Sequence, residues 1–143
     1  TQQCRKGGTM RRILLLPLFF LSACSQYPNT KSLCEGEVSS FGKVNFSDVH
    51  DEIGMSLQND VINFSGSSLL TGRNIKVCKI GSIEFAQKDE AFFDTSGCTM
   101  EGKIGKRTYG TYNFITKKLH ISNEDWLGSD LLLQGTFTCK ESN

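Results

Sequence analysis

The feature that most constrains this chain is a period of two in its apolar residues, which persists over most of the sequence beyond residue 33. Ile53, Met55 and Leu57 alternate with polar residues, and residues 131–139 follow the same pattern. Short alternating runs that are bounded by turn residues, such as Asn59-Asp60, are typical of antiparallel strands with one buried face. No later stretch carries the apolar stripe of a helix, so the sequence predicts an all-β domain.

The domain sequence also repeats an order of features. The segment that begins at Cys34 is echoed by 98–104, and hairpins led by Gly54 and Gly110 follow in each half. This order predicts two duplicated four-strand meanders in one small antiparallel barrel or sandwich. Closure into a barrel is favoured because it removes exposed strand edges. Independent convergence is the alternative, because any two meanders share glycines and alternation.

Residues 10–24 have a different character. Arg11 and Arg12 follow Met10 and precede an apolar run over 13–21, after which small residues lead to Cys24. This is the layout of a secretory signal peptide. The run is too short for a membrane helix, which needs about 20 apolar residues. A buried strand or helix with an accidental cysteine is the alternative.

The sequence Leu21-Ser22-Ala23-Cys24 resembles the lipobox of bacterial lipoproteins. The resemblance implies cleavage before Cys24 and attachment of acyl chains such as palmitate to it. Because Ser25 is not aspartate, it also implies sorting to the periplasmic side of the outer membrane. The expected organisation is an upstream extension over 1–9, a signal peptide over 10–23, a lipidated cysteine and polar tether over 24–32, and a disulfide-bonded β-domain over 33–143.

Six cysteines are present, of which Cys4 precedes the expected start and Cys24 is assigned to lipid. An even number of remaining cysteines in an exported domain predicts two disulfides. Their separations of 20 to 44 residues argue against a zinc site. Three pairings are possible. The repeat favours Cys34–Cys78 and Cys98–Cys139, whereas a barrel closed by its terminal strands would favour Cys34–Cys139.

The composition and motifs argue against several functions. From Cys24 onwards the chain has 12 basic and 15 acidic residues and no basic run, so nucleic acid is not an expected partner. No nucleophile, zinc-protease or phosphate-loop motif occurs. His120 is expected to face solvent from a strand, and the acidic patch around His50 matches no metal cage, so a solvated loop is favoured there. We expect no enzymatic activity, cofactor or metal.

Two insertions distinguish the halves, at 44–52 and 123–127. In a meander both connections lie at the same end, and insertions in repeat proteins often form the binding face. Trp126, the single tryptophan, has acidic neighbours, which suits an interface anchor with a polar rim. The alternative is that Trp126 plugs the core. The predicted partner-binding residues are His50, Asp51, Glu52, Glu124, Asp125 and Trp126.

Two classes of function fit these features. The first is a non-catalytic protein-binding lipoprotein of the immunity, inhibitor, exclusion or accessory type. The second is a carrier of a lipid or other apolar ligand, because barrels of about eight strands can hold one small ligand. A structural envelope role is a third possibility. A packed interior would favour the first class, and an open apolar cavity the second.

Overall fold

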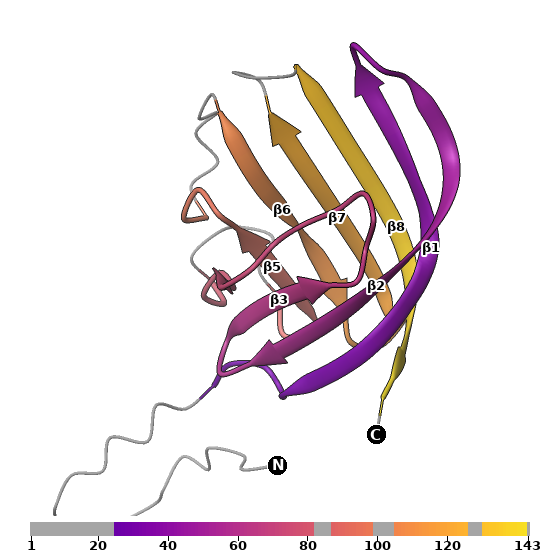
Figure 1. Ribbon diagram of the computed structural model, residues 1–143. Coiled ribbons are helices and arrows are strands. Elements are labelled where there is room, and N and C mark those ends of the chain that lie inside the picture. Colours follow the sequence, from indigo (N-terminus) through magenta and orange to yellow (C-terminus); the bar gives the residue numbers. More distant parts are fainter. Residues whose placement is uncertain (1–24, 82–86, 99–104, 126–129, 143) are drawn as a thin grey trace, which may run out of the picture.

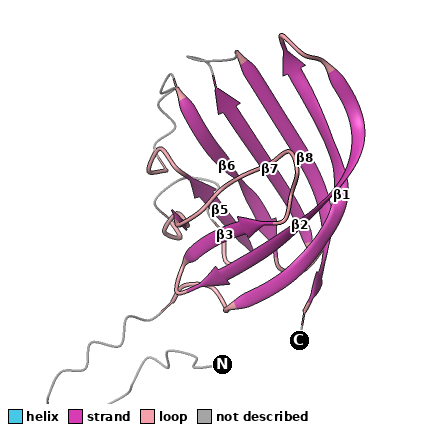
Figure 2. Cartoon of the chain, in the orientation of Figure 1, coloured by secondary structure: helices cyan, strands magenta, loops and turns pink. Residues whose placement is uncertain are grey.

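The computed structural model describes residues 25–81, 87–98, 105–125 and 130–142. The predicted signal peptide, Cys24 and Trp126 lie outside these residues. In the described chain all regular structure is β (Figures 1 and 2), and nothing in it forms a helix able to span a bilayer. The strands are β1 (Thr30–Gly42), β2 (Phe46–Gln58), β3 (Val61–Ser65), β4 (Ile75–Lys76), β5 (Glu90–Asp94), β6 (Lys106–Asn113), β7 (Lys118–Asp125) and β8 (Leu131–Glu141).

The eight strands form one antiparallel sheet in the order β4-β3-β2-β1-β8-β7-β6-β5. Two meanders, β1 to β4 and β5 to β8, join where the first and last strands pair. Among the described residues, the outer strands of this order approach each other through one bridge, between Val77 and Phe93. The Cys78 N–H also donates to the Phe92 carbonyl at 2.7 Å. The sheet is therefore a nearly closed barrel, which confirms the all-β prediction and decides against a sandwich.

The alternating residues fill the barrel. Both Phe93 and Phe137 are almost completely buried, and each occupies space left by a glycine on the inner face of a strand. A Cβ on Gly135 would collide with the Phe137 ring, and one on Gly110 would lie 2.8 Å from Phe93 Cζ. The other fully buried large side chains are Tyr112, Ile53, Met55, Leu57, Ile62, Ile75, Leu119 and Ile121.

The connection from β3 to β4 (66–74) crosses the barrel and plugs it (Figure 1). Its Leu70 is 3% exposed and lies against Gly135. The side-chain amide of Asn123 on β7 accepts a hydrogen bond from Thr71 N–H at 2.9 Å and donates to the Thr71 carbonyl at 3.0 Å. These contacts tie the connection to the opposite wall, so the interior is packed and not open.

The disulfides pair Cys34 with Cys139 and Cys78 with Cys98, so the predicted pairing within each half is wrong. Because β1 pairs with β8, Cys34 lies directly opposite Cys139. Cys78 follows β4, three strand spacings from β1, or roughly 14 Å along the sheet. Disulfides need Cα atoms within about 7 Å of each other. The other bridge spans a Cα–Cα distance of 5.7 Å.

The predicted correspondence between the halves also needs correction. Two four-strand meanders are present, but the second begins with β5 at Glu90, before the cysteine that was expected to open it. Cys34 faces inward from the middle of β1, whereas Cys98 lies in the β5–β6 connection with a φ of 62°. The two cysteines are therefore not equivalent positions of a repeat.

The segment before β1 is part of the domain. The Asp60 carboxylate accepts hydrogen bonds from the N–H groups of Gln26 and Tyr27 at 2.8 to 3.1 Å. Tyr27 is 2% exposed and its ring stacks on Phe114 at 5.5 Å. Residues 30–32 already belong to β1. The prediction of a polar tether over 24–32 is therefore wrong for residues 26–32, because the packing of Tyr27 was not expected from its polar neighbours.

Candidate binding face

The two predicted insertions reach the same end of the barrel where the structure describes them. Gly42, at the end of β1, pairs with Leu131, which also pairs with Asp125 at the end of β7. Lys43 Nζ lies 3.8 Å from Asp130 Oδ2 across this end. The meander geometry that predicted a shared end therefore agrees with the described residues that flank the two connections.

The predicted acidic cluster is nevertheless not assembled. His50, Asp51 and Glu52 lie within β2 and not in a loop, because residues 46–52 pair with β1 around a bulge. Two strands, β1 and β8, separate them from β7, a lateral distance of roughly 14 Å. The register aligns His50 with His120 on β7, so Glu124 is also displaced along that strand. The Glu124 carboxylate instead accepts a hydrogen bond from Tyr109 Oη at 2.5 Å. Trp126, the expected centre of the cluster, lies outside the described residues.

Asp51 has a structural position. It faces the interior at 8% exposure, and its carboxylate accepts hydrogen bonds from Ser67 Oγ at 2.5 Å and Ser68 Oγ at 3.4 Å. Burial by itself would raise the pKa of Asp51, but the hydrogen bonds from Ser67, the Glu52 N–H and Ser68 outweigh it and lower the pKa. The ionised side chain thus holds the plugging connection against β2.

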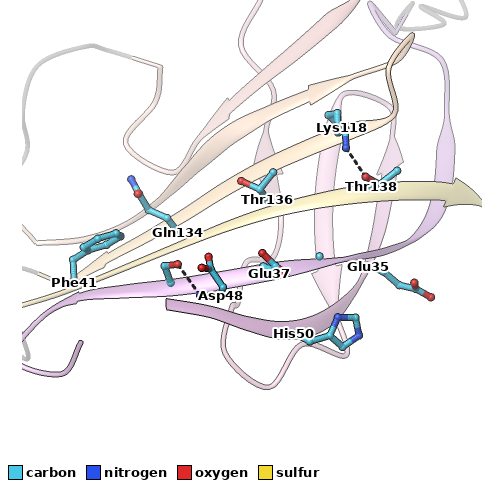
Figure 3. Close-up of a pocket in the computed structure, with 11 residues that line it drawn as sticks. Glu35, Glu37, Phe41, Asp48, His50, Lys118, Gln134, Thr136 and Thr138 are labelled. Carbon is cyan, nitrogen blue, oxygen red and sulfur yellow. Dashed lines mark hydrogen bonds between the residues drawn. The ribbon is translucent and has the colours of Figure 1, made fainter. Parts of the chain in front are cut away.

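His50 lies on the outer face and contributes to a polar hollow of about 540 Å³. The hollow runs over the outer face of β1, with β2 on one side and β8 on the other (Figure 3). The register places His50 opposite Glu37, which in turn lies opposite Thr136 on β8. The residues that line the hollow are Glu35, Gly36, Glu37, Ser39, Phe41, Asp48, His50, Lys118, Gln134, Thr136 and Thr138.

The carboxylates of this face are not neutralised. Glu35 on β1 lies directly opposite Glu52 on β2, and like charges in opposed positions destabilise a sheet. None of the ion pairs formed within the described part of the chain includes Glu35, Glu37 or Asp48. Lys118, the cation of the hollow, donates from Nζ to Thr138 Oγ1 at 2.7 Å. The face therefore carries an excess of negative charge.

An aromatic side chain that the sequence reasoning missed completes the hollow. Phe41 is 48% exposed and lines one end of it. Cys34 and Val38 face inward on β1, so counting in steps of two places Phe41 on the outer face beside Glu35 and Glu37. That phase was available in the sequence. Figure 3 shows the Phe41 ring beside Gln134 of β8.

A second, apolar pocket of about 390 Å³ lies at the same end of the barrel as the Lys43–Asp130 pair. It is bounded by Leu69 of the plugging connection and by the first inward residues of β8. Its lining is Ser40, Lys43, Val44, Phe46, Leu69, Leu131 and Leu133. Pockets of about 300 Å³ or more can accept small ligands.

The described residues offer little reactive chemistry. They contain no group of three or more His, Cys, Asp or Glu side chains placed to hold a metal ion. Cys34, Cys78, Cys98 and Cys139 are all in disulfides. His120 faces outward, with Nδ1 at 3.2 Å from Thr136 Oγ1.

Comparison of the chain with protein-family models, curated proteins and solved structures gave no match.

Proposed function

We propose that this chain is a lipoprotein of the bacterial envelope that binds another protein and has no catalytic activity. Cys24 carries its lipid on the periplasmic side of the outer membrane, and the outer face of β1, β2 and β8 meets the partner. The proposed module is of the immunity, inhibitor, exclusion or accessory type. The lipobox-like sequence and the two disulfides support this setting, because disulfides persist in exported proteins.

The observation that carries the proposal is the hollow with its unneutralised carboxylates. A fold retains opposed like charges, such as Glu35 and Glu52, at a cost in stability. A basic partner would remove that cost on binding, and the acidic face would also speed its association. Phe41 supplies an exposed aromatic side chain of the kind that anchors protein interfaces. The packed interior agrees with a module that binds at its surface.

Charge reversal tests this proposal. The acylated protein is immobilised, and proteins retained from envelope extracts are identified for wild type and for the double variant Glu35→Lys/Glu37→Lys. The matched control, Asp89→Lys/Asp130→Lys, makes the same change in net charge outside the hollow. We expect a partner that is retained by wild type and control, is lost from the hollow variant, and dissociates as salt is raised. Equal retention by all three proteins would contradict the proposal.

A carrier of an apolar ligand is the second candidate, and the apolar pocket at the barrel end favours it. Leu133 lines this pocket, whereas its neighbour Leu132 faces the other side of β8. Binding of a fluorescent fatty acid should therefore be lost in Leu133→Gln and retained in Leu132→Gln. Absence of binding by the wild-type protein would exclude the carrier and leave the binding module.

A further inference from the structure

At the end of the barrel opposite the Lys43–Asp130 pair, the chain enters its first strand, β1. We call this end the entry end. The first described residues and the C-terminus both lie there (Figure 1). The β2–β3 and β6–β7 turns and the segments 77–81 and 87–89 complete it.

The chain is held tightly where it enters. Ser25 Oγ lies 3.4 Å from Asn59 Oδ1, and the next two N–H groups bind Asp60. Cys24 precedes Ser25 directly, and consecutive Cα atoms are about 3.8 Å apart. A lipid on Cys24 would therefore leave no spacer between the bilayer and this end of the barrel.

Two exposed isoleucines flank the entering chain. Ile115, in the β6–β7 turn, is 70% exposed, and Ile80 is 45% exposed. The Ile80 N–H donates to Gln26 Oε1 at 2.6 Å, while Phe114, next to Ile115, stacks on Tyr27. Both apolar side chains are thus fixed beside the point where the lipid would be attached.

The entry end also collects positive charge. Among the described residues, this end has four carboxylates: Asp60, Asp89, Glu90 and Glu141. Asp60 accepts hydrogen bonds from backbone N–H groups, and Glu141 forms an ion pair with Lys117 at 2.7 Å. Six lysines lie around them: Lys31, Lys76, Lys79, Lys88, Lys117 and Lys140. In the rest of the described chain, which includes Lys118 of the acidic hollow, nine carboxylates outnumber five basic residues. The described part of the chain is therefore polarised, with its basic end where the chain enters.

We propose that the entry end docks on the bilayer surface, with Ile80 and Ile115 at the interface and the lysines on anionic phospholipid headgroups. The inference rests on the proposed lipid attachment at Cys24. Exposed apolar side chains within a basic surface bind anionic membranes in two ways: the apolar side chains are buried in the interface, and the positive charges are attracted to the anionic headgroups. Docking in this way would point the apolar pocket away from the membrane and leave the acidic hollow on the side of the barrel, open to a partner.

The test uses the acylated protein in vesicles of phosphatidylcholine with or without phosphatidylglycerol. An environment-sensitive fluorophore is attached to Ile115→Cys, and to Val44→Cys at the opposite end as the control. Val44 is 61% exposed. We expect a blue shift and quenching by nitroxide-labelled lipid at position 115 alone, and only when phosphatidylglycerol is present. Each of Lys88→Gln and Lys140→Gln should lower the ratio of docked to undocked protein about fivefold.

Equal quenching at the two positions, or none at position 115 in phosphatidylglycerol vesicles that retain the protein, would overturn the docking proposal. Mass spectrometry of the same preparation reports separately whether Cys24 is acylated. If Cys24 is not acylated, the proposed anchoring fails, and the labelled protein is added to preformed phosphatidylglycerol vesicles. Quenching at position 115 then supports docking by the surface itself, and its absence overturns docking.

Discussion

Two sides of the barrel are built differently. The long wall, made of β2, β1, β8 and β7, has an uninterrupted ladder between β1 and β8 from Ser32–Glu141 to Gly42–Leu131. The short wall, made of β3, β4 and β5, has strands of five, two and five residues, and its seam has a single bridge. The unneutralised carboxylates lie on the long wall. The comparison suggests that the better-paired wall tolerates the unfavourable charges of the proposed binding face.

The short wall is stabilised by side chains in place of a ladder. Cys78 is bound to Cys98. Asp94, at the end of β5, accepts two hydrogen bonds from the Arg107 guanidinium, one from Nε at 3.1 Å and one from Nη2 at 2.7 Å. Arg107 also lies over the Tyr109 ring, 4.3 Å from its centroid. If the two walls differ as described, substitutions in each should have different consequences.

The largest expected effect is the loss of the disulfide in the long wall. Its cysteines are 105 residues apart in sequence, against 20 for the short-wall bridge. In the chain-entropy model a loop of about 100 residues contributes about 4.7 kcal/mol, and one of about 15 residues about 3 kcal/mol. Urea unfolding should therefore show a greater loss for Cys34→Ala/Cys139→Ala than for Cys78→Ala/Cys98→Ala. The reverse order would mean that the short wall depends on its disulfide more than the long wall does.

Loss of the ion pair in the short wall comes next. Asp94→Asn should lower the free energy of unfolding by about 1.5–3 kcal/mol, the usual value of charge-assisted hydrogen bonds. The exposed Asp130→Asn, which weakens only the 3.8 Å pair with Lys43, serves as control and should change stability little. A similar loss of stability in both variants would show that the Asp94–Arg107 pair stabilises the fold no more than an exposed ion pair does.

The same carboxylate predicts a dependence on pH. Burial would raise the pKa of Asp94, but the hydrogen bonds from Arg107 and Ser96 outweigh it and lower the pKa. The stabilisation is therefore complete above the pKa of the unfolded chain, about 3.9, and is lost as the pH falls through the lower pKa of the fold. Stability of wild type relative to Asp94→Asn should decline on acidification below about pH 4. A constant difference would contradict the assignment.

Asp51 should show a smaller and local effect. Asp51→Asn keeps the shape of the side chain but weakens the acceptor for Ser67 and Ser68, at a cost of about 1–2 kcal/mol. Hydrogen exchange should accelerate in residues 66–70 and remain unchanged in β8. Partner binding should persist, because Asp51 faces the interior. If the variant lost partner binding while hydrogen exchange in residues 66–70 stayed slow, Asp51 would instead belong to the proposed binding face.

The smallest effect should have the opposite sign. Glu35→Gln removes one of the two opposed carboxylates on the long wall, so it should stabilise the fold by a few tenths of a kcal/mol, and more at low salt. A destabilised Glu35→Gln would show that this charge contributes to the fold and is not retained for binding.

The sequence predicted the strand class and the common end that β1 and β7 reach, because apolar alternation and meander order are local rules. It also predicted two disulfides among the right four cysteines, but not their pairing, because Cys34 and Cys139 become neighbours only when β1 pairs with β8. The site was misplaced for a related reason. His50, Asp51 and Glu52 look like a polar insertion, yet pairing with β1 makes them a strand whose residues face opposite sides. Phe41 could have been found from its phase relative to Val38.

The proposed binding face is tested most directly in living cells. A photo-crosslinking amino acid replaces Thr136, at the centre of the hollow, or Ser65, which is exposed on β3 outside it. We predict a discrete crosslinked species from position 136 that is absent from position 65 and disappears in the Glu35→Lys/Glu37→Lys background. Adducts of equal yield from both positions, or an adduct at position 136 that survives the charge reversal, would contradict a partner bound through the acidic hollow.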